Sequence, residues 1–383
     1  MICRLPSLLS LAVLHMAFAS YNSSDVTDII KLIYTVALKA RLKQLFLTQL
    51  LLMEAFMHEL ERELQENYDI KINSISNFRD MFIANTDNGK RLIKLTSLKP
   101  DRVNFIAEVK EHLYKNGFCN IDRNIYTNSG RSCITYNDQT IYMSRYVEGR
   151  ESNLDNRDEI IKCARLLAEM HRASLGFAGS ENSSPRNELG RLPASYRKRL
   201  DEIKKLKKNA LKGRMKFDNL MCRHVDYFHD LGESALDLLD SSSYPALVEE
   251  AEKSRNISHH DFNHHNIFIQ NNELYLINFE YCCYDLKIYD LVNLLRRKMR
   301  KCQWDIGEAE HIINEYSRIQ PLTPGGLELM KIMLMFPQKF WRVVNKYYNS
   351  RKSWSEQSYI NRLEEVIEEV RYLKEFLERF FAI

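Results

Sequence analysis

The chain has 383 residues, of which 45% are hydrophobic and 28% are charged. This composition is typical of a folded protein with a large core, and the length predicts two or three domains or lobes. Twelve glycines and eight prolines leave little room for long linkers. The formal net charge of +4 is too small to predict binding to nucleic acid, so an anionic partner would need a local basic patch.

The eight cysteines show no C-x-x-C pair and no regular spacing. This pattern argues against a zinc module and against a disulfide framework, and it favours a reducing compartment. Cys282 and Cys283 are neighbours, and a disulfide between neighbours would be strained. We therefore expect both to be small, buried, apolar residues.

Residues 1–57 are predicted to be an N-terminal extension of the main fold. The first part has one basic residue, an apolar run and a small-x-small end at 17–19, which together resemble a secretory signal. The run is too short to span a bilayer, and no transmembrane helix is expected. Residues 25–56 are apolar-rich and predict a helix. Three interpretations stay open: an exported or membrane-associated segment, a genuine helical extension, and a misplaced gene start with the true one near Met53 or Met57.

Residues 58–148 are predicted to form a small lobe. MHELERELQENYDI predicts an amphipathic helix, and residues from about 70 to 148 predict a mainly antiparallel sheet with one helix. The sequence KINSISNFRDMFIANTDNGKRLIKLTSL predicts strands that turn at residues 87–89, because Asp-Asn-Gly is a strong hairpin signal. The next segment predicts a helix that begins at Pro100 and ends at Gly117. Three further short strand-like runs complete this lobe.

Residues 149–383 are predicted to be nearly all helical. The exception is NIFIQNNELYLINF, residues 266–279, in which two apolar runs flank Gln270, Asn271 and Asn272 and predict a β-hairpin. The aromatic-rich FPQKFWRVVNKYYNSRKSW and the amphipathic C-terminal helix are expected to pack within this lobe. The predicted fold class is therefore α+β, with a small antiparallel-sheet lobe, a larger helical lobe, and the cleft between them as the default ligand site.

The loop before this hairpin has a spacing of residues that suits phosphoryl transfer. That reaction needs a carboxylate to hold the acceptor hydroxyl, oxygen ligands for magnesium and a cation over the phosphates. Asp261 supplies a carboxylate, and Asn266 places an amide oxygen where it can reach a metal. Asn278 and Glu280 follow at the end of the second strand. The alternative is that Asp261 and Asn266 only cap local turns.

Four histidines in the same loop raise the question of a zinc site: His259, His260, His264 and His265. No cysteine or carboxylate ladder of matching spacing accompanies them. We therefore expect these histidines to form hydrogen bonds and to brace the loop.

Three stretches together resemble a known family: HHDFNHHNIFI, LINFEYCCYDLKIYDLVNLLRR and MLMFPQKFWRVVNKYYNSRKSW. They are similar to the CotS family of spore coat proteins, within the aminoglycoside and choline kinase-like phosphotransferases, from about Glu59 to the C-terminus. The resemblance implies a bilobal protein kinase-like fold. It also implies synthesis in the cytoplasm and deposition in the spore coat, with other spore coat proteins as partners.

The resemblance further implies roles for single residues, with ATP and Mg²⁺ as cofactors if the site is active. Asp261 would be the catalytic base, and Asn266 would be a magnesium ligand. Asn278 and Glu280 would lie at the second metal-binding position. Lys94, which ends the strand RLIK, would hold the α- and β-phosphates.

Other positions would complete the nucleotide site. Glu108 would pair with Lys94, with Glu111 as the alternative, and an ordinary surface pair is the competing interpretation of Lys94 and Glu108. The remaining implied positions are the hinge beside the adenine, from Tyr142 to Glu148 with Tyr146 and Glu148 as binding residues, and the structural residues His171 and Asp290.

Two features depart from the active pattern. Asn278 stands where the resemblance implies an aspartate, and a neutral amide does not neutralise magnesium as a carboxylate does, unless Glu280 substitutes for it. The loop that would cover the phosphates has no glycine between Asn73 and Asp87, although glycine permits close approach of the backbone. We therefore expect a spore coat structural or assembly protein on a kinase-like scaffold with a degraded or weak site. The alternative is an active ATP- and Mg²⁺-dependent phosphotransferase acting on a small-molecule hydroxyl or a protein.

The run RKRLDEIKKLKKNALKGRMK, residues 197–216, carries ten basic residues and two acidic ones. It predicts either a solvated helical face or a docking surface for an acidic partner or anionic polymer. A location outside the cell is the alternative to the spore coat if the signal-like N-terminus is real.

Overall fold

The computed structural model describes residues 55–78, 81–349 and 355–380. The predicted signal-like segment and most of the predicted N-terminal extension lie outside these residues. The helix over residues 55–67 packs on the small sheet, where Leu60 and Leu64 are fully buried. Among the described helices, none is both long and apolar enough to cross a membrane.

Six strands form the small sheet: β1 (Ile72–Phe78), β2 (Met81–Thr86), β3 (Gly89–Thr96), β4 (Asn124–Ile125), β5 (Ile134–Tyr136) and β6 (Gln139–Arg145). Their order is β1-β2-β3-β6-β4, β5 pairs with β6, and every pair is antiparallel. Thr86 pairs with Gly89 across the predicted turn between β2 and β3, and Gly89 has a φ of 91°. The predicted antiparallel sheet and its hairpin turn are confirmed.

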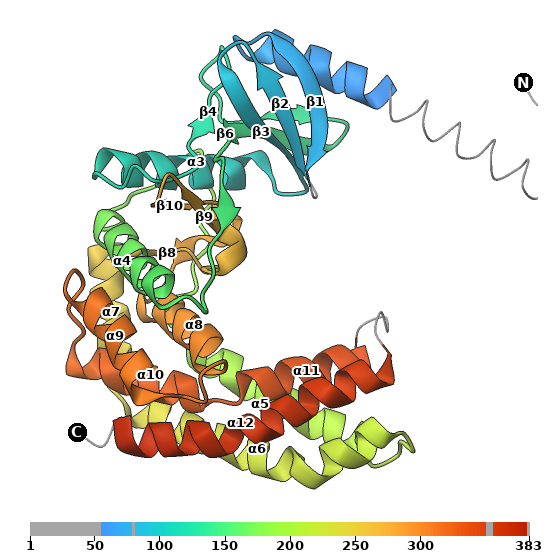
Figure 1. The fold of residues 1–383 in the computed structure, drawn as a ribbon, viewed down its shortest axis with the longest axis vertical. Coiled ribbons are helices and arrows are strands. Elements are labelled where there is room, and N and C mark those ends of the chain that lie inside the picture. Colours follow the sequence, from blue (N-terminus) through green and yellow to red (C-terminus); the bar gives the residue numbers. More distant parts are fainter. Residues whose placement is uncertain (1–54, 79–80, 350–354, 381–383) are drawn as a thin grey trace, which may run out of the picture.

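The helix α3 (Pro100–Lys115) joins the small sheet to the rest of the molecule (Figure 1). It begins at Pro100, and Gly117, just beyond its end, has a φ of 88°, as the sequence predicts. Its apolar face belongs to the main core, where the ring of Phe105 meets that of Phe177 edge-on with centroids 5.5 Å apart. The small sheet is therefore tied to the helical region through α3.

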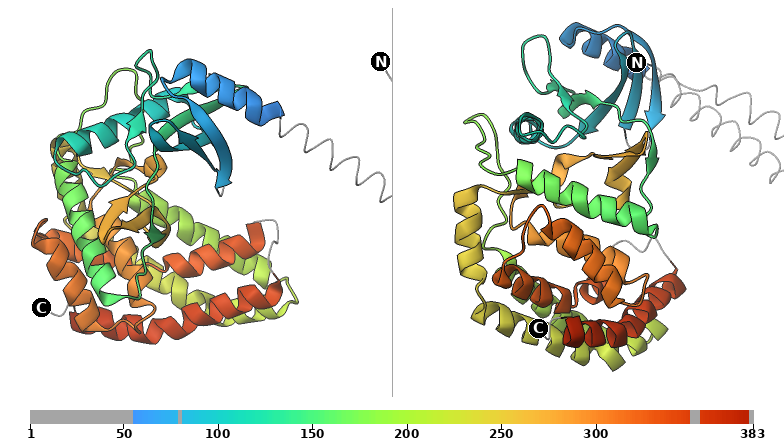
Figure 2. Two further views of the ribbon diagram at one scale, coloured as in Figure 1. Left: turned by 45° about the horizontal axis from the view of Figure 1, so that its top comes forward. Right: turned by 60° about the vertical axis from the view of Figure 1, so that its left-hand side comes forward.

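The predicted second hairpin consists of β9 (Ile267–Gln270) and β10 (Glu273–Leu276) and lies between the small sheet and the helices (Figure 2). Asn271 and Asn272 turn it with φ values of 51° and 66°, which suit a two-residue turn. A third strand, β7 (Arg150–Glu151), pairs with β9. Gly149 precedes it, and a Cβ there would lie 2.2 Å from the carbonyl oxygen of Ile269, so this crossing requires glycine.

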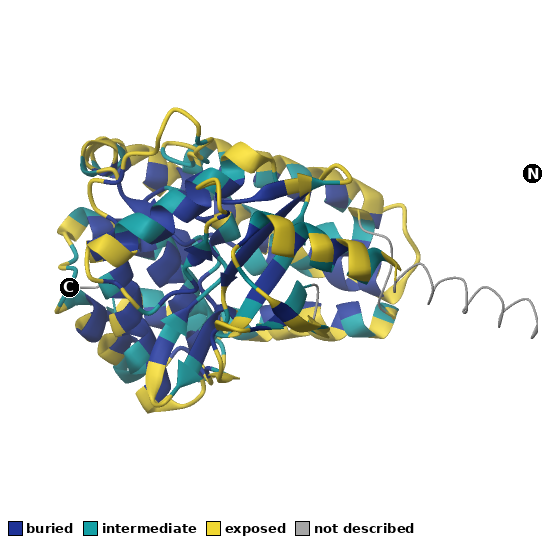
Figure 3. Ribbon diagram, turned by 90° about the horizontal axis from the view of Figure 1, so that it is seen from above, coloured by how far each residue is buried: buried dark blue, intermediate teal, exposed yellow. Residues whose placement is uncertain are grey.

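The helical region contains α4 (Arg157–Ala173), α5 (Leu192–Ala210), α6 (Lys216–Ser241), α7 (Tyr244–Ser254), α8 (Ile288–Met299), α9 (Ile306–Ser317), α10 (Pro324–Met335), α11 (Gln338–Asn349) and α12 (Glu356–Phe380). Two short strands, β8 (Ile257–Ser258) and β11 (Cys283–Tyr284), and two 3₁₀ turns, η1 (His264–Asn266) and η2 (Phe279–Tyr281), complete it. Buried residues run through its interior and exposed residues follow its outer turns (Figure 3). The predicted α+β fold with a sheet lobe and a helical region is confirmed.

A second core holds together α5, α6, α11 and α12, which project as a platform below the small sheet (Figure 1). The ring of Phe340 stacks on Phe228 with centroids 4.2 Å apart, and Tyr347 stacks on Phe217 at 3.9 Å. Stacked aromatic pairs of this kind stabilise a core beyond the area that they bury. The predicted packing of the aromatic-rich stretch and of the C-terminal helix within this lobe is confirmed.

Candidate functional site

Asp290, at the start of α8, anchors the loop that carries Asp261. Its side chain is fully buried and accepts hydrogen bonds from the backbone N–H of His259 at 2.7 Å and of His260 at 2.9 Å. The Nε2 of His171 lies 3.3 Å from the same carboxylate, and its Nδ1 lies 2.8 Å from the hydroxyl of Tyr316. The predicted structural residues His171 and Asp290 are thus in contact, and together they hold the start of the loop that carries Asp261 in place.

The electrostatics of this anchor keep one negative charge inside the protein. Burial acts to raise the pKa of Asp290, but the hydrogen bond and proximity of His171 outweigh it, and the pKa is held below its ordinary value. Burial lowers the pKa of His171. Its Nε2 donates to Asp290, because an ionised carboxylate can only accept a hydrogen bond. His260 has a φ of 67°, a left-handed value that aims two successive N–H groups at one carboxylate.

Asp261 is held by two amide side chains of its own loop. Asn263 donates to its Oδ1 at 2.8 Å, and Asn266 donates to its Oδ2 at 2.7 Å. Asn263 also accepts from the N–H of His265 at 2.9 Å, so the turn-capping interpretation applies to Asn263. The Asp261 carboxylate is partly buried and lines a cavity of about 350 Å³. It is therefore oriented and still open to a ligand.

The other predicted site residues extend this arrangement into one hydrogen-bonded line. The amide of Asn278 donates to Oδ1 of Asn266 at 3.2 Å and accepts from Nζ of Lys94 at 3.2 Å. Lys94 also forms an ion pair with Glu280 at 3.0 Å. Asn278 has φ and ψ of 64° and 65°, a left-handed conformation that asparagine tolerates better than most residues. The structure thus brings Lys94, Asp261, Asn266, Asn278 and Glu280 together.

The predicted partner of Lys94 is wrong. Glu108 does not pair with it, because the Glu108 carboxylate accepts hydrogen bonds from Ser180, including one from the backbone N–H at 3.0 Å. The alternative, Glu111, is paired with Arg123 at 2.9 Å. Glu280 takes the place of both, since η2 presents it directly to Lys94. Tyr142, whose hydroxyl lies 3.2 Å from the other Glu280 oxygen, supports it there.

Of the predicted hinge, Tyr142 lies within β6, and Tyr146 and Glu148 follow the end of that strand. Glu148 pairs with Lys90, and both side chains are about half exposed, at 53% and 50%. The ring of Tyr146 meets Phe78 edge-on with centroids 6.1 Å apart. An exposed ion pair of this kind contributes little to stability. A role for Tyr146 and Glu148 beside an adenine stays a prediction.

One charged pair at the site escaped the sequence analysis. Lys110 is only 1% exposed, and its Nζ lies 3.1 Å from Asp122 and 3.1 Å from Oδ1 of Asn124. The same carboxylate oxygen of Asp122, Oδ2, is approached by the backbone N–H of Asn278 at 3.5 Å. Lys110 falls on the apolar stripe of α3, four residues after Ile106, and a lysine at such a position was the available signal.

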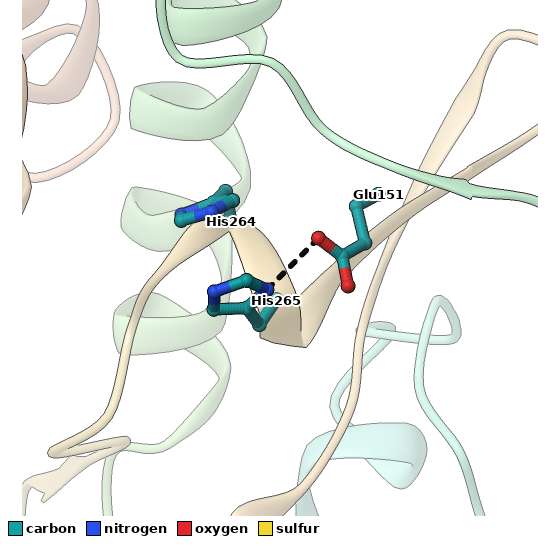
Figure 4. A group of neighbouring side chains, drawn as sticks. All are labelled: Glu151, His264 and His265. Atoms are coloured by element: carbon teal, nitrogen blue, oxygen red, sulfur yellow. Dashed lines mark hydrogen bonds and ion pairs between the residues drawn. The ribbon is translucent and has the colours of Figure 1, made fainter. Parts of the chain in front are cut away.

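The loop histidines brace the structure as expected. His260 bonds Asp285 at 2.8 Å and stacks on Tyr289 with centroids 3.9 Å apart. His265 bonds Glu151 of β7 at 2.9 Å, and His264 lies beside it (Figure 4). The ligand atoms of Glu151, His264 and His265 lie within 4.8 Å of one another and could share a metal ion.

A second group of possible ligands contains His260, Asp285 and Cys283. Burial raises the pKa of the Cys283 thiol, which disfavours the thiolate that a metal would need. Cys282 and Cys283 are both buried free thiols, so the prediction for this pair is confirmed.

Comparison with solved structures establishes the fold. An aminoglycoside phosphotransferase from Alicyclobacillus acidocaldarius matches 83% of this chain and 94% of its own, with a TM-score of 0.73 and 20% identity. A spectinomycin phosphotransferase in complex with ADP and spectinomycin matches 83% of this chain and 98% of its own, with a TM-score of 0.60 and 14% identity. The predicted kinase-like phosphotransferase fold is therefore confirmed.

Comparison of sequences is more specific. Spore coat protein S of Bacillus subtilis (strain 168) is 27% identical over 321 residues, which cover 81% of this chain and 89% of that protein. The sequence model of the family described as "spore coat putative kinase YutH" matches residues 61–380. The resemblance predicted from the sequence is confirmed, and the chain belongs to this spore coat family of putative kinases.

Proposed function

We propose that the protein is a component of the spore coat, built on a phosphotransferase scaffold whose metal-nucleotide site is weakened. The observation that carries the weakened site is the position of Asn278, whose neutral amide lies in hydrogen-bond contact with both Lys94 and Asn266. The name of the Bacillus subtilis relative supports the location in the coat, with other coat proteins as partners.

The donor set fits magnesium poorly. Magnesium prefers carboxylate and phosphate oxygens, and Asn266 and Asn278 offer only neutral amide oxygens. The nearby carboxylate of Asp261 already accepts hydrogen bonds from Asn263 and Asn266. The charge of a second nearby carboxylate, Glu280, is balanced by Lys94 at 3.0 Å. A metal-nucleotide complex would have to break this pair, moving Glu280 to the ion and Lys94 to the phosphates. The glycine-free strands β1 and β2 add a second obstacle to close contact with phosphates.

An active phosphotransferase is the second candidate function. It is favoured by the oriented carboxylate of Asp261, which would hold the acceptor hydroxyl of a small molecule or a protein. In that case ATP with Mg²⁺ is the phosphoryl donor, Lys94 contacts its phosphates, and Asn266, Asn278 and Glu280 provide oxygen ligands. The spectinomycin phosphotransferase binds ADP, and an amicoumacin kinase of the same fold binds AMP-PNP and Ca²⁺.

The test is calorimetric titration of ATP into the full chain, with and without Mg²⁺, repeated on Asn278→Asp. We expect weak or no Mg²⁺-dependent binding by the natural chain and a gain of about tenfold in affinity, or about 1.4 kcal/mol, for the variant. Asn271→Asp, which adds the same charge at an exposed position in the turn of the same hairpin, is the matched control. Tight Mg²⁺-dependent binding by the natural chain would support the second candidate function instead.

A further inference from the structure

A large basic cavity lies beside the catalytic loop, on the side of α8, α11 and α12. It has a volume of about 1010 Å³, and its walls include His264 of the loop, Trp304 and Tyr372. A smaller cavity of about 150 Å³ shares part of its wall and continues it toward α11. Four arginines line the smaller cavity, and two of them, Arg297 and Arg300, also line the large one. We name this group the arginine cleft: Arg296, Arg297, Arg300 and Arg342.

The sequence of α8 explains why three of these arginines gather. The helix buries an apolar face that includes Leu291, Leu294 and Leu295 in the main core. Its opposite face, in the last turn, carries Arg296 and Arg297, and Arg300 follows at the C-cap. Cations at a helix C-terminus interact favourably with the helix dipole, which offsets part of their mutual repulsion. Arg342 comes from α11 and adds a fourth charge.

The carboxylates of this region neutralise only part of the charge. Glu369 lies 3.6 Å from Arg300 and 3.4 Å from Lys339, and Glu365 lies 3.6 Å from Lys339. Arg296 donates to the carbonyl oxygen of Met333. Within the described residues, no ion pair joins a carboxylate to the remaining members of the cleft: Arg296, Arg297 and Arg342.

The unbalanced charge affects the arginines themselves. Burial lowers the pKa of Arg296 to about 10, and it also lowers the pKa of Arg297 and Arg300. The charge of Arg342, which lines the smaller cavity with them, lowers the pKa of all three further. The cleft begins next to the loop that carries Asp261, because His264 of that loop lines the main cavity together with Arg297. Partly desolvated cations without anionic partners are costly, and an anionic ligand removes that cost.

The basic run of residues 197–216, predicted to be either a solvated helical face or a docking surface, differs from the arginine cleft in its ion pairs. Residues 197–210 of it belong to α5, where Arg197 pairs with Asp240, Lys204 with Glu233 and Lys207 with Asp226. All three carboxylates lie on α6, which packs beside α5. Three of the ten basic side chains of the run are therefore paired with carboxylates of its own neighbour, in exposed ion pairs. In the arginine cleft, only Arg300 has such a partner among the described residues.

We propose that the arginine cleft binds an acidic segment of a partner polypeptide, with its carboxylates against Arg296, Arg297 and Arg342. An extended chain fits better than a single small anion, because Arg297 lines the main cavity while Arg296 and Arg342 line only the smaller cavity that continues it. The main cavity is also at the upper end of the size of small-molecule sites. The proposal rests on the coat-component part of the proposed function and names the chemistry of the partner. It needs neither ATP nor Mg²⁺.

The test measures the binding of a fluorescent deca-glutamate peptide to the full chain by anisotropy, without nucleotide. We expect binding that weakens with salt and that falls about tenfold in the variant Arg297→Gln/Arg342→Gln. The matched control Lys204→Gln/Lys207→Gln removes the same charge from α5 and should change the affinity less than about twofold. A deca-glutamine peptide should not bind. Thermal melting of each variant shows whether it is folded, and Arg342→Gln alone, an exposed position, gives a second variant should the double one unfold.

Four outcomes would overturn the proposal. These are no binding by the natural chain, equal loss in the two double variants, inorganic phosphate displacing the peptide at equal concentration of charge, and tighter binding of a ten-residue oligothymidylate. Because nucleotide is absent, a failure here is distinct from a failure of the ATP titration. Unchanged peptide binding by Asn278→Asp is expected for the same reason.

Discussion

Asp290 and Asn278 lie at two ends of the same unit of loop and hairpin, and their surroundings differ in kind. Asp290 is fully buried and receives hydrogen bonds from two backbone N–H groups and from His171. Asn278 is partly buried and touches Lys94 and Asn266 at 3.2 Å each, with no charge of its own. The support of the catalytic loop is complete, while the charge that a metal would need is missing. Stability and the proposed binding of a metal-nucleotide complex therefore depend on different residues and can be tested separately.

The largest loss of stability is expected from removing the buried carboxylate of Asp290. Asp290→Ala would leave two N–H groups and the His171 ring without their acceptor, and removing one partner of a buried charged group costs about 3–5 kcal/mol. Chemical denaturation of the variant measures this loss. Asp201→Ala, on the exposed side of α5, is the control and should change stability by less than about 0.5 kcal/mol. A loss below about 1 kcal/mol for Asp290→Ala would contradict the anchoring role.

The next effect concerns Lys110, whose partner Asp122 is approached by the backbone N–H of Asn278. Lys110→Met would leave the carboxylate of Asp122 buried without its cation and should cost about 3 kcal/mol, measured by the same denaturation. The double variant Lys110→Met/Asp122→Asn should recover part of the loss, because no buried charge then lacks a partner. Equal stability of the single and double variants would show that the two groups are not coupled.

The sequence predicted the elements whose signals are local. Asn271 and Asn272 determine the hairpin turn, Pro100 and Gly117 bound α3, and Asp261 and Asn266 meet because only four residues separate them. These outcomes depend on backbone preferences and short loops.

The partners that sequence analysis missed are all set by tertiary packing. Lys94 pairs with Glu280 because η2 turns that carboxylate toward β3, across 186 positions of the chain. The choice of Glu108 rested on the resemblance, and the loop at Ser180 removes that carboxylate from the site. The arginine cleft needs α8 and α11 to face each other, which no local pattern indicates.

A smaller effect on stability is expected from pH, through the buried histidines His171 and His259. Burial lowers the pKa of His171 and His259 below the ordinary value of about 6.5. At a pH between the folded-state pKa and the ordinary pKa of a histidine, the unfolded chain binds more protons than the folded one. The free energy of unfolding should therefore fall as the pH drops below about 6.5, by up to about 1.4 kcal/mol per pH unit for each histidine. Asp290, whose folded pKa is depressed, loses its contribution only at lower pH, as the pH falls through its folded pKa. Denaturation curves from pH 7.5 to 5 for the natural chain and His171→Gln measure the slope, which should be shallower in the variant. Equal slopes would contradict this assignment.

The smallest effect on stability is expected from Glu280→Gln, which removes one charge of the partly buried ion pair between Glu280 and Lys94. Its side chain is 18% exposed and that of Lys94 is 12% exposed, so the loss should be about 1 kcal/mol. The more informative readout is ATP binding without Mg²⁺. If Glu280 holds Lys94 away from phosphates, the variant should bind ATP about fivefold more tightly, because the lysine charge becomes available to the triphosphate. Glu108→Gln removes the same charge from α3 at a distance from Lys94 and should leave ATP binding unchanged. Unchanged binding in Glu280→Gln, or the same gain in both variants, would mean that the Lys94–Glu280 pair does not control the site, and the glycine-free strands β1 and β2 would then be the main obstacle to nucleotide binding.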